Sequence, residues 1–541
     1  MKEESRQKVA LFSSYKKGSE VFRLASFLAK RGWKLLASGG THTHLSGLGL
    51  TVQNVADWVG GTAIFNHLVV TLSREVAAAL LAPWTKEADE ELAKLGVSRI
   101  DLVYCDPYDL RSAVEAVGAT CQSVIDATDI GGPTMLREAA KGENRFAICR
   151  AEEVDEYIKW VEAGKPDPEA YMQSLNARTE FEVCKYVSLS ALFHGKGKFF
   201  ATFAEFVCAL KYGENGPQVP AALYATDTKD PLALHRFKFL TKNPIGFVNW
   251  TDVDRVLTTM TTAAATFDVH FNGKEMPNFA IGVKHGNPCG AAFSASPVIA
   301  CEKMVTGDLR AIFGGVVMTN FHIGIDEAEA LIEHGQDKPR RLSGVVAPSF
   351  SERSFDFLSS RGCFLMTNPA LDSLDRDSLQ QEQVVRQVRG GLLTQPSNSF
   401  ILDFNDPNLK RPSDLTLSEE QWLDLLLADV ICRTSNSNTV TIVKGGMLIG
   451  NGVGQQDRVG CCELAIKRAF DAGHNVNGAA VRSDSFFPFE DGPKVLCRAG
   501  VGVVLATSGS VRDEAVRETF RLGGVAFLTL PDKDARGFCC H

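Results

Sequence analysis

The sequence lacks the long apolar runs and the positive charge that mark several classes of protein. No apolar run approaches the 18 residues that a membrane-spanning helix requires. The charged beginning, MKEESRQKVALF, has no apolar core of the signal-peptide kind. A formal net charge of −8 argues against a general nucleic-acid binder and leaves room only for local basic pockets. We therefore expect a protein that contacts neither membrane nor nucleic acid.

The 14 cysteines follow no regular spacing and form no C-x-x-C pair. In a chain of this length such a pattern indicates reduced thiols and a cytosolic location. The adjacent pairs Cys461–Cys462 and Cys539–Cys540, the second followed by His541, rarely ligate one ion together, so we expect no zinc site. A repeat of 20–50 residues is also missing, which argues against a solenoid.

The composition is that of an ordinary globular protein. The chain has 541 residues, of which 45% are hydrophobic and 23% charged, so two or more domains are expected. Strand and helix patterns alternate in the first part, which predicts a parallel sheet with helices on both faces, an α/β fold. The predicted strands are 8–14, 33–37 and 101–106, and the predicted helices are 19–32, 38–49 and 129–142.

A charged helical stretch, 151–200, follows, and the alternation then resumes towards the end of the chain. Strands are predicted at 438–443 and 447–450, and a helix at 459–470.

Two glycine turns in the first part each lie between a strand and a helix. They read SGGT (38–41) and DIGGPT (129–134). Glycines allow a sharp turn, and the free N–H groups of the first helical turn attract anions. Each turn alone is equally typical of a tight connection with an N-cap. Two of them in one small α/β unit favour an anionic ligand.

A third glycine-rich segment, GNGVGQQDR (450–458), has the spacing G-x-G-x-G rather than that of a dinucleotide site. No acidic residue is placed to bind a ribose. Arg458 nonetheless has the reach to bind a carboxylate or phosphate.

The segment VKHGNPCG (283–290) delivers Lys284 and His285 together to the end of an apolar strand. At a strand end that enters a turn, both side chains can face one cleft. A nearby ammonium disfavours an imidazolium, so His285 would stay neutral and able to accept a proton. Lys284 would supply positive charge for a developing oxyanion. The alternative is an exposed basic pair at a sheet edge.

These motifs, taken together and in order, resemble the bifunctional purine-biosynthesis family that joins an AICAR transformylase to an IMP cyclohydrolase. The resemblance covers essentially the whole chain, with the departures of a divergent member. The segments that carry it are SGGT, DLVYCDPYDL, DIGGPTMLREAAK, LKYGEN, VKHGNPCGAA, FGG, RQVRGGLLTQ, SNSN, GVGQQDR and SDSFFPF.

The resemblance implies a cyclohydrolase domain over 1–200 with a methylglyoxal-synthase-like parallel α/β fold. It implies a transformylase domain over 201–541, built from two cytidine-deaminase-like α/β units (about 205–370 and 385–541) without catalytic zinc. It also implies a cytosolic homodimer with the transformylase sites at the subunit interface.

The implied chemistry answers why a lysine and a histidine stand together. The transformylase moves a formyl group from 10-formyltetrahydrofolate to the 5-amino group of AICAR, and the cyclohydrolase closes the product, FAICAR, to IMP. The attacking amine must lose a proton, which calls for a neutral base. By resemblance, His285 is that base, Lys284 lies beside the formyl group and Asn438 hydrogen-bonds the transferring group.

By the same resemblance, nucleotide or folate contacts a further set of transformylase residues, and potassium binds near Asp484. Three positions depart from the family: Lys211 replaces arginine, Pro217 replaces histidine and Ser343 replaces an acidic residue. The expected contact residues are Lys211, Tyr212, Asn249, Arg458, Phe486 and Arg536.

The first domain matches the family at catalytic residues Tyr108, Asp129 and Lys141 and at the phosphate loop Ser38, Gly39, Gly40 and Thr41. Two positively charged family residues are neutral here, as Leu68 and Val70, while Thr71 is kept. His67 or Arg74 is able to compensate. An altered loop, SSYKKG (13–18), leaves open whether Lys16 or Lys17 is the family's lysine.

We expect an active transformylase with a slow cyclohydrolase, since ring closure is intramolecular and needs less help than a bimolecular step. One alternative is a transformylase whose first domain binds nucleotide but is inert. Another is a nucleotide-binding pseudoenzyme that signals or scaffolds. The joint retention of Lys284, His285 and Asn438 argues against the latter.

Overall fold

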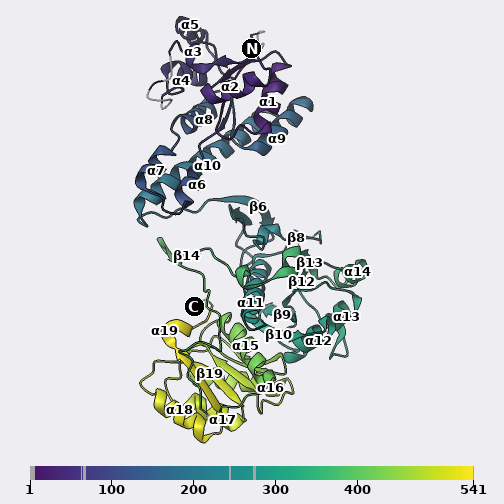
Figure 1. Cartoon of the computed structure of the whole chain (residues 1–541). Coiled ribbons are helices and arrows are strands. Elements are labelled where there is room, and N and C mark those ends of the chain that lie inside the picture. Colours follow the sequence, from purple (N-terminus) through teal and green to yellow (C-terminus); the bar gives the residue numbers. More distant parts are fainter. Residues whose placement is uncertain are drawn as a thin grey trace. The chain divides into compact units, whose positions relative to one another are not determined.

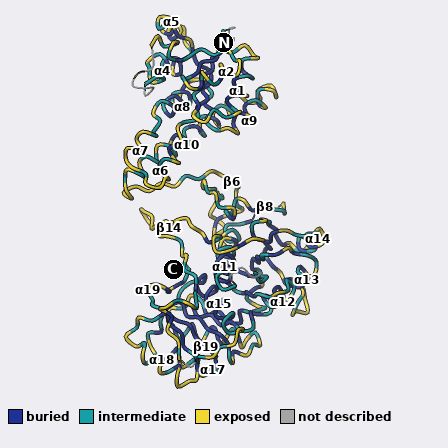
Figure 2. The backbone as a smooth tube through the Cα atoms, viewed as in Figure 1, coloured by how far each residue is buried: buried dark blue, intermediate teal, exposed yellow. Residues whose placement is uncertain are grey.

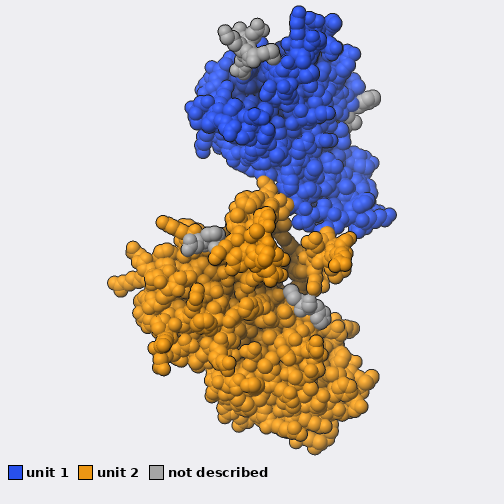
Figure 3. Space-filling view, turned by 180° about the vertical axis from the view of Figure 1, so that it is seen from behind, with its two compact units in different colours: residues 1–203 blue, residues 204–541 orange. Residues whose placement is uncertain are grey.

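A computed structural model of the chain consists of two compact units, Met1–Phe203 and Ala204–His541 (Figure 3). No helix among the described residues is long and apolar enough to cross a membrane. The described residues are 6–61, 64, 69–242, 245–271, 276–413 and 415–539.

The first unit, drawn in purple and blue in Figure 1, contains a parallel sheet with helices beside it. The sheet has five strands in the order β3-β2-β1-β4-β5. Its strands are β1 (Val9–Ser14), β2 (Lys34–Ala37), β3 (Gln53–Asn54), β4 (Leu102–Asp106) and β5 (Phe146–Ile148). Its helices are α1 (Ser19–Ala29), α2 (Gly39–Gly47), α3 (Val55–Trp58), α4 (Arg74–Leu81), α5 (Lys86–Lys94), α6 (Leu110–Glu115), α7 (Cys121–Asp126), α8 (Gly131–Lys141), α9 (Ala151–Glu162) and α10 (Pro168–Gly195).

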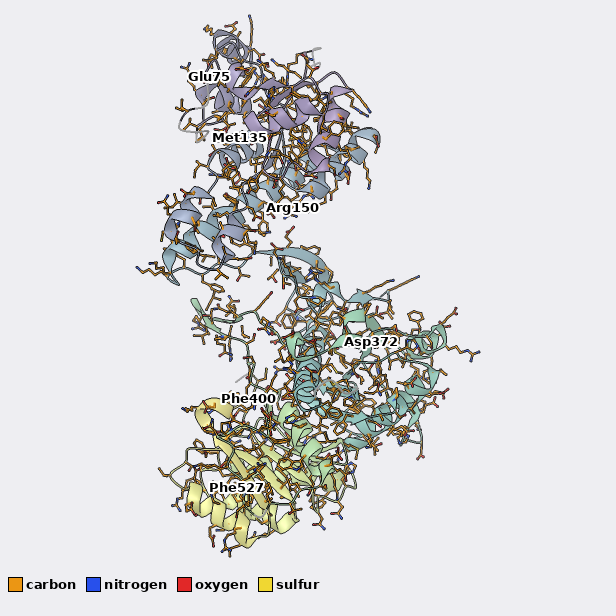
Figure 4. All side chains as sticks on the ribbon, viewed as in Figure 1. Glu75, Met135, Arg150, Asp372, Phe400 and Phe527 are labelled. Carbon is orange, nitrogen blue, oxygen red and sulfur yellow. The ribbon has the colours of Figure 1, made fainter. Side chains whose placement is uncertain are left out.

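Successive side chains of the central strands point to opposite faces of the sheet and so belong to two separate hydrophobic cores. Leu11 and Val103 join the core beneath α4 and α8, to which Met135 also belongs (Figure 4). Phe12 and Tyr104 join the core beneath α1 and α9. Helices therefore cover both faces, and the predicted parallel α/β fold is confirmed.

The second unit contains one continuous sheet of eleven strands, in the order β20-β19-β18-β16-β17-β10-β9-β11-β12-β13-β8. Its strands are β8 (Lys238–Phe239), β9 (Asn278–Lys284), β10 (Asn287–Ser294), β11 (Val316–Thr319), β12 (Gly344–Ala347), β13 (Phe364–Thr367), β16 (Val440–Lys444), β17 (Met447–Gly452), β18 (Ala480–Ser483), β19 (Val503–Ser508) and β20 (Ala526–Pro531). Its α-helices are α11 (Phe247–Phe271), α12 (Pro297–Gly307), α13 (Ile325–Glu333), α14 (Glu352–Ser360), α15 (Glu419–Arg433), α16 (Arg458–Asp471), α17 (Asp491–Ala499), α18 (Asp513–Leu522) and α19 (Asp532–Ala535). Short 3₁₀ turns lie at Leu234–Arg236, Pro369–Ser373 and Arg376–Ser378.

This sheet is built from two copies of one arrangement, which we call half A and half B. In half A a long helix, α11, precedes the hairpin β9–β10, and α12, β11, α13, β12, α14 and β13 follow. Half B repeats that order from α15 to β20. Helices α11 and α15 share one core on one face, while α12–α14 and α16–α18 cover the other face. The halves join where β10 pairs antiparallel with β17.

Two hairpins of the second unit stand apart from the large sheet. Strands β6 (Ala204–Leu210) and β7 (Ala221–Thr226) pair with each other, as do β14 (Val384–Val388) and β15 (Gly391–Gln395). Every residue of β14 and β15 is exposed (Figure 2). Since an isolated two-stranded hairpin is marginally stable in water, both hairpins are incomplete as they stand.

Two of the three glycines of GNGVGQQDR, Gly450 and Gly452, serve helix packing. A Cβ at Gly450 would overlap the carbonyl oxygen of Ala465 on α16, and one at Gly452 would overlap that of Cys461. A strand glycine often marks such a close backbone approach. The segment thus brings α16 against β17, a role that accounts for Gly450 and Gly452 without a dinucleotide, while Gly454 adopts a positive φ of 67°.

We expect Gly452→Ala to destabilise the second unit by about 1–3 kcal/mol, because a helix carbonyl cannot move aside as a flexible side chain can. Thermal unfolding of the full chain measures the change. Gly216→Ala is the control, since a Cβ there meets nothing within 4 Å. Equal melting temperatures for the two variants would contradict the packing role.

Candidate active sites

In the first unit, the predicted site residues gather at the carboxyl ends of β1, β2 and β4. The sheet order reverses direction between β1 and β4, because β2 and β3 lie on one side of β1 and β4 and β5 on the other. Ligands of open α/β sheets bind at such a switch point. Ser14 ends β1 there, and its backbone N–H donates to the Thr41 hydroxyl at 2.9 Å.

The loop Ser38–Thr41 begins helix α2, as predicted. The Ser38 hydroxyl donates to that of Ser13 at 3.1 Å. The Lys17 side chain packs against Gly40. Its Nζ lies 3.6 Å from the position that a Cβ atom on Gly40 would occupy. The backbone N–H of Lys16 instead donates to Asp106 at 3.0 Å. Lys17, rather than Lys16, is therefore the lysine beside the Ser38–Thr41 loop.

Tyr108 and Asp129 also lie together at this edge. The backbone N–H groups of Gly132, Tyr108 and Gly131 donate to the Asp129 carboxylate, but burial outweighs them and raises the pKa of Asp129. Burial, and then the charge of Asp129, raises the pKa of Tyr108, so its hydroxyl keeps its proton at neutral pH. The Tyr108 ring meets Tyr15 edge-on at 5.5 Å.

The structure does not bring every expected residue to this edge. Lys141 ends α8, ten residues beyond Gly131, so their Cα atoms lie about 15 Å apart along the helix. Arg74 is exposed and pairs with Glu75 at 3.4 Å. Val70 is half-buried and packs against the core beneath α4. Leu68 and His67 lie outside the described residues.

In the second unit, Lys284 and His285 lie where the hairpin β9–β10 turns. Lys284 is half-buried, and its ammonium donates to the carbonyl of Phe313 at 2.7 Å. His285 is exposed at φ 52°, and Gly286 follows at φ 70°. These two positive φ angles form the tight turn that suits the twist of a hairpin.

Asn287 joins this turn to half B. Its amide donates to the carbonyl of His285 at 3.2 Å and accepts from the backbone N–H of Asn436 at 3.0 Å. Asn438, two residues later, donates to the carbonyl of Gln455 at 3.0 Å. The turn and the SNSN segment therefore lie side by side.

Arg458, at the start of α16, completes this cluster. It donates to the Asn438 side chain at 2.8 Å and pairs with the buried Asp484. Arg536 pairs with Asp532 just beyond, and the backbone N–H of Gly537 donates to the carbonyl of Asp484 at 3.1 Å. The predicted residues Asn438 and Arg458 thus meet, and the segment that carries Arg536 adjoins them at Asp484. Phe486 follows Asp484 by two residues and is half-buried.

Most of the remaining expected residues lie near the start of α11. The carbonyl of Tyr212 accepts from Phe247 at 3.2 Å, at the start of that helix. Lys211 lies over the Tyr212 ring at 5.7 Å. Asn249 lies in the first turn of α11, three residues before Asp252, which binds the His285 turn. Ser343, one of the departures, donates to the carbonyl of Gly314 at 2.7 Å.

The hydrogen bonds around Asp484 do not suit the binding of a potassium ion. Its carboxylate already accepts from the Ser437 hydroxyl at 2.7 Å and from the Thr439 backbone N–H at 3.1 Å, besides Arg458. A carboxylate so engaged by donors and by an arginine charge is a poor cation ligand.

Two contributors to the site do not follow from the sequence patterns. Asp252 gives no signal, because no periodicity links it to Gly286, 34 positions later in the chain. Asn451 belongs to the glycine-rich segment, and its buried amide donates to the carbonyl of Pro288 at 3.1 Å. An asparagine between two glycines is the one sequence feature that could have pointed to it.

Comparison with known proteins agrees with this geometry. The family model "AICARFT/IMPCHase bienzyme" matches residues 168–468, and "MGS-like domain" matches residues 20–134. A "Bifunctional purine biosynthesis protein PurH" of Cutibacterium acnes is 31% identical over 529 residues, and one of Anoxybacillus flavithermus is 30% identical over 527. Each alignment covers 95% of this chain and 96% of the relative.

A solved structure, "Crystal structure of ForH", is 28% identical, with a TM-score of 0.32, and the match covers 35% of this chain and 97% of that one. The matches of the family model and of the full-length relatives decide the family. This chain belongs to the AICARFT/IMPCHase bienzyme family, the bifunctional enzymes of purine biosynthesis that join an AICAR transformylase to an IMP cyclohydrolase.

Proposed function

We propose that the His285 turn and the Asn438–Arg458 cluster together catalyse formyl transfer from 10-formyltetrahydrofolate to AICAR. The observation that carries this proposal is the hydrogen bond between Asn287 and Asn436, residues 149 apart in the chain. It places a base, an ammonium and an amide donor at one end of the joined halves. That set suits an amine attacking a formyl group.

In the proposed step the amine nitrogen of AICAR bonds to the formyl carbon. His285 accepts the amine proton, so the nitrogen does not carry a full positive charge. The bond from the formyl carbon to N10 of the folate then breaks, and N10 takes up a proton, which His285 returns. The products are FAICAR and tetrahydrofolate.

Lys284 and Asn438 stabilise the oxygen that becomes negative during this step. The Lys284 ammonium uses one donor on Phe313 and keeps two N–H groups for a ligand. Asn438 is fixed at both ends, since its amide donates to Gln455 and its oxygen accepts from Arg458. A donor held in advance loses little by reorganisation when charge develops.

We expect His285→Ala to lower kcat for formyl transfer about 100-fold or more, with the KM for AICAR changed less than about threefold, because a base acts mainly in the transition state. Tetrahydrofolate release measures the rate. Lys284→Ala should also lower kcat strongly, and the double variant should lose far less than the product of the single losses.

The control is His322→Ala, which removes another exposed histidine of half A, hydrogen-bonded to Ser349 at 2.8 Å. Turnover near that of the unmodified enzyme in His285→Ala would remove this residue from the mechanism.

We also propose a homodimer, with the transformylase sites at its interface. The two hairpins support it, because each exposes apolar side chains without a third strand among the described residues. Lys211 and Tyr212 follow β6 directly and lie in the connection between the two strands of the first hairpin. The exposed apolar residues are Phe206, Val207, Tyr224, Val384, Val385, Val388, Leu392 and Leu393.

Leu393→Asp should shift the dimer towards monomer, because Leu393 is 60% exposed on the free hairpin and a charge there opposes burial. Sedimentation velocity measures the assembly, and transformylase activity should fall in step with dissociation. Leu522→Asp, at a 72% exposed leucine outside both hairpins, is the control. Fully active monomers would refute the interface sites.

For the first unit we propose slow closure of FAICAR to IMP. Lys17 and the N–H groups of the Ser38–Thr41 loop bind the phosphate, since a helix N-terminus and a lysine attract an anion together. Asp129 accepts the proton of the carboxamide nitrogen as that nitrogen attacks the formyl carbon. The Tyr108 hydroxyl donates a proton to the formyl oxygen and regains one from Asp129. The bond from the formyl carbon to that oxygen then breaks as the former formamide nitrogen loses its own proton, which completes the leaving water.

We expect Tyr108→Phe to slow IMP formation from FAICAR about tenfold or more, since it removes a hydroxyl beside Asp129 and little else. Lys141→Ala should cost less, because Lys141 ends the helix about 15 Å from Gly131. Absorbance of IMP in the full-length enzyme measures both. An equal or larger loss in Lys141→Ala would return Lys141 to the catalytic set.

The ligands of the enzyme under this proposal are AICAR, FAICAR, IMP and the folate. We place it in the cytosol. The 12 cysteines described from Cys105 to Cys497 are free thiols, which is in keeping with a reducing compartment.

A further inference from the structure

The turn that presents His285 has a conformation that its sequence does not favour. Both central residues have positive φ, 52° at His285 and 70° at Gly286. Glycine adopts such angles freely, but a residue with a Cβ is disfavoured there. Something outside the turn must therefore hold His285 in place.

Asp252, on α11, provides that hold. Its carboxylate is 3% exposed and accepts from the backbone N–H of Gly286 at 2.7 Å and also from that of His285. Asn287 donates to the carbonyl of His285 at 3.2 Å. The backbone of His285 is thus bound on both sides, while its imidazole stays exposed.

Half B repeats the arrangement without the histidine. Asp424, on α15, accepts from the backbone N–H groups of Gly445 at 2.9 Å and Gly446 at 2.7 Å. Those two residues have φ of 63° and 69°. An aspartate that binds a hairpin turn is therefore a feature of both halves, and only in half A does the turn carry a side chain with catalytic chemistry.

We propose that Asp252 is a positioning residue for formyl transfer, which acts by fixing the left-handed conformation of His285. The inference rests on the proposed role of His285 as the base. If the two N–H groups lose their acceptor, His285 is free to adopt negative φ, and its imidazole leaves the cluster around Asn438. A displacement of about 1 Å at a reacting group is enough to cost about 100-fold in rate.

The test compares Asp252→Asn with Asp424→Asn in the full-length enzyme. Each substitution keeps the side-chain shape but puts an amide donor against a backbone N–H. We expect kcat for formyl transfer to fall about tenfold to 100-fold in Asp252→Asn, with the KM for AICAR changed less than about threefold. In Asp424→Asn we expect kcat to stay within about twofold. Similar kcat losses in both variants would overturn the positioning role.

A double-variant cycle separates positioning from general structural damage. If Asp252 acts through His285, Asp252→Asn should lower kcat no further once His285→Ala is present. A further tenfold loss in that background would overturn the proposal. Should Asp252→Asn fail to fold, Asp252→Ser, which keeps an acceptor oxygen, takes its place in the same comparison.

The same series separates this inference from the function on which it rests. Full activity in His285→Ala means that the base assignment fails. An inactive His285→Ala together with a fully active Asp252→Asn means that the base assignment holds and the inference fails.

Discussion

The antiparallel pairing of β10 with β17 is the constraint on which the proposed transformylase site depends. It sets the hairpin turn of half A against the first residues of the half B strands. Asn451 fixes this register, because its buried amide donates to Pro288 and to the Ser435 hydroxyl, each at 3.1 Å, and accepts from Thr441 at 2.7 Å. A fully satisfied buried amide specifies one arrangement strongly. Neither half alone holds the site, so the two expected units act as one sheet.

Because the two halves have the same arrangement, the joined sheet has a second place equivalent to the proposed site. Comparing the side chains at the two places shows which of them set the proposed site apart. Asn278 corresponds to Asn438, since the next residue of each donates to a side chain at the end of a neighbouring strand, Asn320 or Asp484. At the equivalent place, the polar groups form hydrogen bonds with other groups of the protein. Lys444, the counterpart of Lys284, donates to the carbonyls of Asn475 and Asn477 at 3.0 and 2.7 Å. The proposed site differs from its equivalent by the presence of His285 and Arg458, while the backbone arrangement is shared.

The sequence predicted the parts of this molecule that depend on local patterns. Strands β1, β2 and β4 and helices α1, α2 and α8 follow from apolar periodicity and glycine turns, which act over a few residues. The choice between Lys16 and Lys17 was out of reach, because it depends on the left-handed backbone of Lys17, at φ 52°. The role of Asp252 was equally hidden, because a hydrogen bond across 34 residues leaves no periodic trace.

In the first unit, two free-energy contributions can be compared to judge whether catalysis survives the loss of positive charges. A charge-assisted hydrogen bond is worth about 1.5–3 kcal/mol, so we expect the neutral Val70 to cost a contribution of that size, if the charged family residue makes such a bond. Holding two reacting groups together in one molecule supplies about 7–11 kcal/mol of the barrier reduction in favourable cases, and FAICAR carries both groups itself. The phosphate loop with Lys17 and the Tyr108–Asp129 pair remain. Under the proposed function these stronger contributions to catalysis are intact, so we expect the substitutions to reduce the rate of ring closure rather than remove it.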